Sequence, residues 1–263
     1  MDHRPLTSGE IDILEANACT CHDWTRIRVA DPFRPQHYRH ATFSGDVTLG
    51  TTEEVLTGGG HVPMQTGIYF ARIHNCNIGD NVLIDRIGNY IADYDIADGT
   101  LIANTACIAM TGESTFGNGI EVSVLNETGG REVPIYDCLS AHVAYIIAMY
   151  RHNKELIGRL RKLVDDYVES RRSSRGKIAD HVTIVNTGTI NDLYVGPHAT
   201  IDGATRLVNG SIMSEADDPV FVGPNVMAED FILCAGAKVD CGAVLVHTLS
   251  LIHISEPTRR SYI

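Results

Sequence analysis

The sequence predicts an all-β protein that winds into a parallel β-helix, and a recurring six-residue period carries this prediction. Between residues 78 and 108, an apolar or aromatic side chain occupies every sixth position. The members of this run are Ile78, Ile84, Tyr90, Ile96, Ile102 and Ile108. Neither the 3.6-residue period of a helix nor the two-residue alternation of a single strand explains this spacing. A six-residue period is typical of coils in which each hexad supplies one short strand and one turn.

The same period returns in two later segments of the chain. The first contains Ile178, Ile184, Ile190, Val195, Ile201 and Leu207, with one residue missing before Val195. The second follows a polar stretch at 214–219 and contains Val222, Ala228, Cys234, Asp240 and Val246. Side chains at the fifth place of the hexads are mostly small, with Tyr94 as the bulky exception. Three runs of this kind indicate one repeat architecture with a narrow interior.

This repeat resembles the hexapeptide-repeat superfamily, whose members fold as left-handed parallel β-helices with three hexads, or eighteen residues, per coil. The left-handedness is implied by the resemblance alone, because parallel crossovers are normally right-handed. Eighteen-residue coils would stack Ile78 beneath Ile96, and Tyr90 beneath Ile108, about 4.8 Å apart. Residues 6–24 also resemble the start of an uncharacterised bacterial domain-of-unknown-function family built on this prism.

Breaks in the period predict the organisation of the chain. From Ser140 to Ser170, apolar residues at three- and four-residue spacing indicate one long amphipathic helix. The last residues resemble a translated sequencing adapter, so we expect a non-native tail and a longer natural protein. The predicted regions are an N-terminal cap with a short helix at 1–40, a first β-helix part at 41–136, a helical insertion at 137–177, a second β-helix part at 178–249 and the tail at 250–263.

Charge and composition exclude some classes of partner. The chain of 263 residues has a formal net charge of −12, whereas nucleic-acid binding needs clustered lysines and arginines. No apolar run approaches the length of a membrane span, and no signal peptide opens the chain. The seven cysteines are scattered without a Cys-x-x-Cys pair, which favours a reducing compartment. We therefore expect a cytoplasmic protein that binds neither nucleic acid nor membrane.

The segment around His74 is the strongest candidate for chemistry. His74 stands four residues before Ile78-Gly79 and is followed by Asn75 and Cys76. This arrangement resembles the catalytic rung of the lipid A-type acyltransferases of the superfamily. The resemblance implies that His74 is a general base and that Asn75 is the adjacent polar residue that binds substrate. An imidazole suits this role because it titrates near neutral pH and can accept a proton and return it.

Two departures from the family pattern bear on this assignment. The family rung opens with an aliphatic residue, where this chain has Arg72. The family also has a glycine eighteen residues after the base, whose backbone N–H binds the thioester oxyanion, where this chain has Ala92. A backbone donor survives at Ala92, so the resemblance still implies a substrate-binding role there. The alternative is that His74 is an ordinary surface residue that hydrogen-bonds its neighbours.

Other candidate sites carry less information. His181 and His198 fall at turn positions of their hexads, and His142 could face a cleft beside the predicted helix. The chain contains no His-x4-His pair of the kind found in zinc-dependent enzymes of this fold, so we expect no metal site. Residues 58–61 lack the Lys-Ser/Thr of a phosphate loop and are expected to be a flexible insertion.

Two classes of function remain. The first is an acyl- or acetyltransferase that moves an acyl group from a thioester carrier, either acyl-CoA or acyl-carrier protein, to a sugar or nucleotide-sugar. It would hold no permanently bound cofactor, and the resemblance implies a homotrimer with sites between subunits. The second is a non-catalytic β-helix scaffold of a larger protein. Fold likeness alone does not choose between them.

Overall fold

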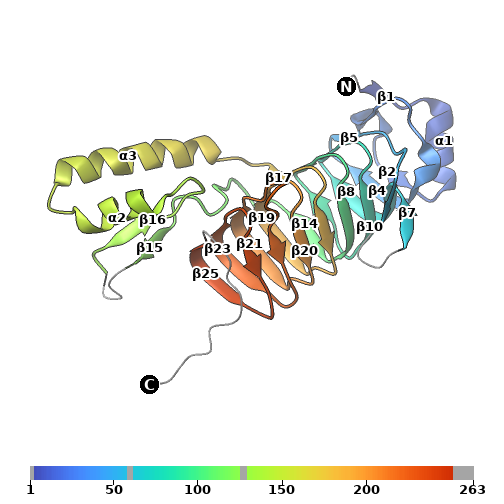
Figure 1. The fold of residues 1–263 in the computed structure, drawn as a ribbon. Coiled ribbons are helices and arrows are strands. Elements are labelled where there is room, and N and C mark those ends of the chain that lie inside the picture. The colour runs from blue at the N-terminus through green and yellow to red at the C-terminus, as the bar shows by residue number, and fades with distance from the viewer. Residues whose placement is uncertain (1–2, 58–61, 125–128, 251–263) are drawn as a thin grey trace.

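Most of the chain lies in one large, mostly parallel β-sheet that winds along a common axis (Figure 1). The computed structural model describes residues 3–57, 62–124 and 129–250. The glycine-rich segment at 58–61 and residues 251–263 of the predicted tail lie outside the described residues. Within the described part, 21 strands belong to this sheet, and two antiparallel hairpins stand apart from it.

The strands before the interruption of the sheet are short. They are β1 (Arg4–Pro5), β2 (Thr20–Cys21), β3 (Ile27–Val29), β4 (Tyr38–Ser44), β5 (Val47–Leu49), β8 (Gly67–His74), β9 (Asn77–Ile78), β10 (Leu83–Ile87), β11 (Ile91–Ala92), β12 (Tyr94–Ile96), β13 (Leu101–Thr105) and β14 (Cys107–Ala109). The strands after it are β17 (Gly176–Ile178), β18 (Thr183–Val185), β19 (Thr189–Val195), β20 (Thr200–Asp202), β21 (Arg206–Ile212), β22 (Phe221–Val222), β23 (Met227–Leu233), β24 (Lys238–Val239) and β25 (Val244–Ser250). The hairpins are β6 (Val55–Thr57) with β7 (Pro63–Gln65), and β15 (Glu121–Ser123) with β16 (Glu132–Pro134).

Parallel pairing arranges the inward side chains in three columns, and we call one passage of the chain through all three a coil. The first column contains Leu49, Ile78, Ile96, Ile178, Val195, Ile212 and Leu233. The second contains Ile68, Ile84, Ile102, Ile184, Ile201, Val222 and Val239. The third contains Phe43, Ile73, Ile91, Ile108, Ile190, Leu207, Ala228 and Leu245. The predicted stacking of Ile78 beneath Ile96 is therefore confirmed.

The predicted stacking of Tyr90 beneath Ile108 is wrong by one residue. Ile91 pairs with Ile108 and is fully buried, whereas Tyr90 is 40% exposed and lies just outside the strand. The coil from Ile91 to Ile108 is seventeen residues long, although the coil from Ile73 to Ile91 has eighteen. A shorter corner lets the aliphatic residue enter the dry interior, while the phenol hydroxyl of Tyr90 stays near water.

The buried positions in the last coils are also displaced by one residue from those that the six-residue period predicts. Leu233, Val239 and Leu245 are the buried members of the columns there, in place of the expected Cys234, Asp240 and Val246. Val246 is 56% exposed. Coils of seventeen residues, from Val222 to Val239 for example, explain the slip because a strict six-residue count drifts by one position per coil.

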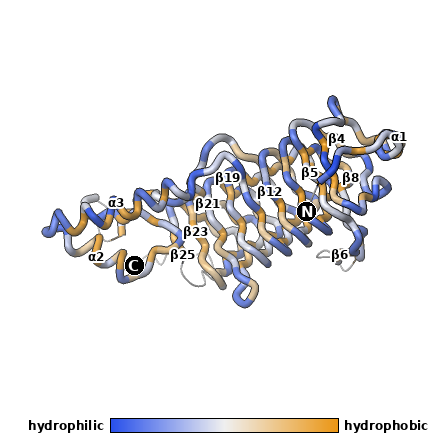
Figure 2. Tube along the Cα trace, turned by 90° about the horizontal axis from the view of Figure 1, so that it is seen from above, coloured by the Kyte–Doolittle hydropathy of each residue, from blue (hydrophilic) through white to orange (hydrophobic). Residues whose placement is uncertain are grey.

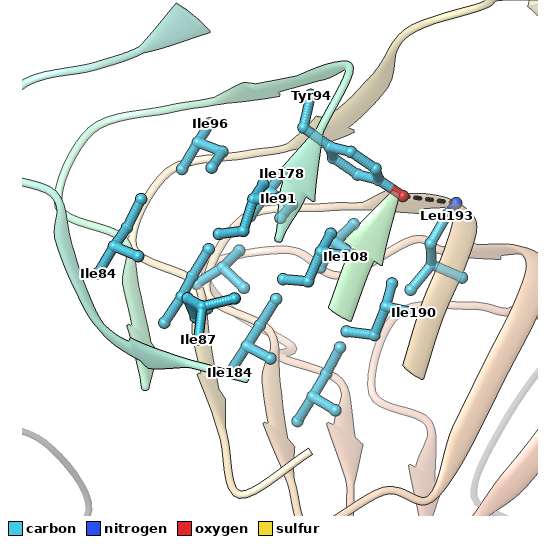
Figure 3. Close-up of a cluster of buried hydrophobic side chains, with 14 of the residues drawn as sticks. Ile84, Ile87, Ile91, Tyr94, Ile96, Ile108, Ile178, Ile184, Ile190 and Leu193 are labelled. Carbon is cyan, nitrogen blue, oxygen red and sulfur yellow. Dashed lines mark hydrogen bonds between the residues drawn. The ribbon is translucent and has the colours of Figure 1, made fainter. Parts of the chain in front are cut away.

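Tyr94 is a bulky side chain that is fully buried in the interior of the stack (Figure 3). Its hydroxyl oxygen accepts a hydrogen bond from the Leu193 backbone N–H at 2.9 Å, which satisfies the buried polar atom. Tyr94 pairs with Gly176 one coil away, and a Cβ at Gly176 would lie 2.3 Å from the Tyr94 ring. Only glycine fits beneath this ring without moving one of the two strands.

The N-terminal residues combine a helix with the first coils of the sheet. Helix α1 (Ser8–Ala16) starts in a capping box, with the Thr7 hydroxyl and the Glu10 carboxylate each bonded to the other residue's backbone N–H. Arg4 ion-pairs with Glu10 at 2.7 Å and holds the pKa of that carboxyl down at about 2. Short 3-10 helices span Trp24–Arg26 and Pro35–His37. Parallel pairing already begins here, because β2 pairs with β4 and β3 with β5, earlier than the expected start at 41.

The parallel strands are interrupted after Ala109 and resume at Gly176. The single long helix expected from Ser140 to Ser170 is wrong, because two helices occupy this stretch, α2 (Ala141–Met149) and α3 (Lys154–Arg171). Ser140 caps α2, and the Asn153 side chain accepts the Leu156 N–H at 3.1 Å to start α3. The residues before them, which the six-residue count placed in the β-helix up to 136, form the antiparallel hairpin β15–β16.

The interrupting segment packs on the outer surface of the last coils. Val133 and Ile135, from around β16, and Ile147 of α2 form a buried cluster with Ile232 of β23. Asp137 is fully buried as a side chain and ion-pairs with Arg171 of α3 at 2.6 Å, and it also accepts a hydrogen bond from the Tyr167 hydroxyl. In Figures 1 and 2, the helices extend beyond β25 at the end of the stack opposite α1.

The corrected register predicts unequal effects of two neighbouring substitutions. Ile91→Ala should lower the free energy of unfolding by about 2–5 kcal/mol, because it removes a fully buried side chain and leaves a cavity. Tyr90→Ala should cost less than about 1 kcal/mol, because that side chain is largely outside the core. Urea unfolding followed by circular dichroism measures both values. A larger loss for Tyr90→Ala than for Ile91→Ala would contradict this register.

Candidate functional site

His74 is the last residue of β8, and the strand alternation directs its side chain outward. Ile73 before it and Cys76 after it are fully buried or nearly so, whereas His74 is exposed. Ser44 of β4 pairs with His74 one coil away, and its Oγ lies 2.8 Å from the His74 Nδ1. Within the described residues, no hydrogen bond involves the other ring nitrogen, Nε2. One nitrogen of the imidazole is thus held by the protein, and the other is left without a partner in the described part of the chain.

The imidazole lines a pocket of about 310 Å³ that spans three neighbouring coils. The pocket is formed by Thr42, Ser44, Arg72, Ile73, His74, Tyr90 and Ala92. Helices α2 and α3 lie toward the opposite end of the stack from β8 (Figure 1), and no residue of either helix lines this pocket. The segment that interrupts the sheet therefore leaves the surface around His74 uncovered.

Asn75 forms the corner of the coil directly after His74. Its φ of 51° lies in the left-handed region, where asparagine is better tolerated than most residues. Its Nδ2 donates to Asp93 Oδ1 at 2.5 Å, so the side-chain amide already binds the corner residue of the next coil. The corner geometry fixes the direction of the chain directly after His74. The predicted contact of Asn75 with substrate stays a prediction.

Ala92 lies in β11 directly beside His74, one coil along the stack. It pairs with His74 on one edge and with Ala109 on the other, and its carbonyl accepts the Met110 N–H at 3.3 Å. The N–H and C=O of a strand residue point to the same side, so the Ala92 amide is directed toward β14. This amide can bind an oxyanion only if that pairing opens, and the predicted role of Ala92 stays a prediction.

The remaining histidines lie away from the pocket. His181 and His198 have φ values of 55° and 57° at consecutive corners, which confirms the interpretation of both as turn residues, and their tilted rings have centroids 5.1 Å apart. His142 is an exposed residue of α2. Among the described residues, no three His, Cys, Asp or Glu side chains are grouped so that they could hold a metal ion.

Sequence reasoning missed the pocket residues that other coils supply. Ser44 stands thirty positions before His74, and the β6–β7 hairpin between them hides the register that brings the two together. Tyr90 was expected inside the stack, but its outward position makes it a wall of the pocket. The six-residue count could have found Tyr90 only if the shortened corner had been recognised.

Burial predicts the reactivity of the thiol beneath the site. Cys76 is fully buried, and this burial raises the pKa of its thiol to about 11. The thiolate is the reactive form, so Cys76 should react with iodoacetamide at pH 8 about 100-fold or more slowly than the exposed Cys241. Its rate should rise as the pH approaches 11. Peptide mass spectrometry over a time course measures both rates, and equal labelling of the two cysteines would contradict the described burial.

Comparison with known proteins identifies the family. A model described as "Domain of unknown function (DUF4954)" matches residues 3–251. An uncharacterised protein of Treponema pallidum (strain Nichols) is 27% identical over 247 residues, which cover 90% of this chain and 34% of that protein, so the chain spans about a third of the relative's length. Among the described residues, no helix combines the length and apolar character needed to cross a membrane. The chain belongs to the DUF4954 family.

Proposed function

We propose that the stack of coils is a left-handed parallel β-helix of the hexapeptide-repeat type. The three columns of inward aliphatic residues and the parallel pairing of consecutive coils support this proposal. The residues at the corners, such as Asn75, Asn104 and Asn186, adopt positive φ angles that suit tight turns between short strands. Coils of seventeen to eighteen residues agree with three hexads per coil.

We further propose that the pocket around His74 is a site of acyl transfer. The observation that carries this proposal is the 2.8 Å contact between Ser44 Oγ and His74 Nδ1 in a histidine that lines a pocket and whose Nε2 has no hydrogen-bond partner among the described residues. In the tautomer in which Nδ1–H donates to Ser44, Nε2 has the free lone pair that a general base requires. A base also needs space for a substrate next to this nitrogen, and the pocket supplies it.

The proposed reaction joins an acyl thioester to a hydroxyl or amine of a sugar or nucleotide-sugar. His74 Nε2 takes the proton of the acceptor as its oxygen or nitrogen attacks the thioester carbonyl carbon. The tetrahedral intermediate collapses with cleavage of the C–S bond, and the imidazolium returns its proton to the leaving thiolate. The thiol of coenzyme A or of an acyl-carrier protein is released, and the acyl group remains on the acceptor.

The resemblance to acyltransferases also supports a homotrimer, in which a neighbouring subunit would complete the pocket. His74 lies on the outer surface of the stack, where such a neighbour could reach it. A trimer would bury the open side of the pocket and so exclude water from the reacting thioester. The scattered cysteines support a location in the reducing cytoplasm.

A non-catalytic scaffold is the second candidate function. The pairing of the Ala92 amide with β14 favours it, because the expected oxyanion donor is occupied. The 34% coverage of the longer relative favours it too, since an activity of that protein could belong to another part of it. In this case, the Ser44–His74 contact would only stabilise the surface of two adjacent coils.

The acyl-transfer proposal predicts a selective effect of one histidine. His74→Ala should lower turnover by about 10²–10⁴-fold, because a positioned general base is lost, while the circular-dichroism spectrum stays unchanged. His142→Ala, which removes an exposed histidine of α2, is the matched control and should retain full turnover. Thiol release from acyl-CoA and acyl-carrier protein donors, with sugar-nucleotide acceptors, measures the rates. Equal turnover of wild type and His74→Ala would exclude His74 as the base, and no turnover with any donor would favour the scaffold.

A further inference from the structure

Arg72 is the pocket residue for which the fold provides no partner. It stands two residues before His74 on β8, so both side chains leave the same outer face of the strand. Within the described residues, Arg72 forms no ion pair and no hydrogen bond, although eleven other arginines are ion-paired. Arg72 is an exposed residue, so its guanidinium is available to a ligand in the pocket.

The pocket has no acidic residue in its lining that would repel an anion. The residues with polar side chains along it are Arg72, His74, Thr42, Ser44 and Tyr90. The Asp93 carboxylate, at the corner after Ala92, accepts a hydrogen bond from the Asn75 amide. The guanidinium and the hydroxyls can donate hydrogen bonds, and the guanidinium presents a planar fork that matches phosphate oxygens.

The common strand indicates where the rest of such a ligand would lie. Arg72 and His74 are two residues apart on β8, so their Cα atoms are about 7 Å apart and their side chains leave the same face of the strand. A ligand whose phosphate is bound by Arg72 would therefore extend along the pocket that His74 and Tyr90 also line.

We propose that Arg72 binds a phosphate ester group of the substrate, so that the pocket selects phosphorylated ligands over neutral ones. This inference rests on the proposed acyl transfer for the role of His74, but the anion site itself does not depend on catalysis. Two substrates of that reaction contain a pyrophosphate, the nucleotide-sugar acceptor and the coenzyme A donor. The shared chemistry is the phosphate ester, and the experiment below separates the two sources.

The test is a titration of the protein with inorganic pyrophosphate, uridine diphosphate and coenzyme A at constant ionic strength, followed by calorimetry. Arg72→Ala should weaken binding of pyrophosphate and of at least one nucleotide about 10-fold or more, because a charge-assisted bidentate contact is lost. Arg72→Lys should bind with intermediate affinity, because it keeps the charge and loses the fork. If Arg72→Ala weakens the binding of uridine diphosphate more than that of coenzyme A, the site belongs to the acceptor. If it weakens the binding of coenzyme A more, the site belongs to the donor.

Arg39→Ala is the matched control. Arg39 is an exposed residue of β4 that likewise has no ion pair among the described residues, and it does not line the pocket. Its loss should change pyrophosphate binding less than about 2-fold, as expected for a solvent-screened charge outside the pocket. Equal affinities for wild type and Arg72→Ala, or no binding of any of the three probes to wild type, would overturn the proposal.

His74→Ala separates this inference from the acyl-transfer proposal. It should abolish turnover if His74 is the base, yet retain most of the pyrophosphate affinity, because Arg72 remains. Binding that depends on Arg72, without any acyl transfer, would support the anion site and exclude the proposed reaction. Acyl transfer that depends on His74 but is unchanged in KM and kcat by Arg72→Ala would remove the anion site alone.

Discussion

The stacking of each inward side chain directly on the residue one coil away is the constraint on which the rest of the structure depends. Parallel pairing places neighbouring strands about 4.8 Å apart, so each inward side chain packs directly against those of the coils before and after it. Every column must therefore be filled by side chains that can stack in this way. Aliphatic residues fill the three columns for this reason, apart from Phe43. Tyr94 lies two positions before the column residue Ile96, and it fits only because Gly176 leaves room for its ring and the Leu193 amide satisfies its hydroxyl. A single bulky residue thus determines its neighbours in two other coils.

The same constraint positions the candidate site. A coil can close only if a residue adopts a positive φ at each tight corner, and Asn75 does so directly after His74. Its amide binds Asp93 at the next corner, which ties consecutive coils together outside the core. Because Cys76 then points inward, the chain direction at His74 is fixed from both sides. Ser44 lies beside His74 for the same reason, since strand register leaves it no other place.

Much of the fold could be predicted from periodicity, and the errors have a common physical origin. The columns that contain Ile78 and Ile96 were predictable because aliphatic residues recur wherever the interior is dry. The slips at Tyr90 and Val246 were not, because a corner can lose one residue without any change in the apolar pattern on either side. The break between α2 and α3 was hidden in a similar way, since apolar spacing continues through it and only the Asn153 cap marks the new start.

The two halves of the stack differ in what covers their outer surfaces, and this difference limits where chemistry can occur. The hairpin β15–β16 and helix α2 cover β23 with apolar side chains, and the ion pair of the buried Asp137 with Arg171 fastens α3 to that assembly. In the other half, Leu56 and Met64 of the β6–β7 hairpin pack on Leu83 and Leu101, whereas no residue of either hairpin lines the pocket around His74. In the described part of the molecule, that pocket is lined by an arginine without an ion pair and by a histidine with one unbonded ring nitrogen. The surface around His74 is therefore open to a ligand, while the covered surfaces hold the protein's own segments together.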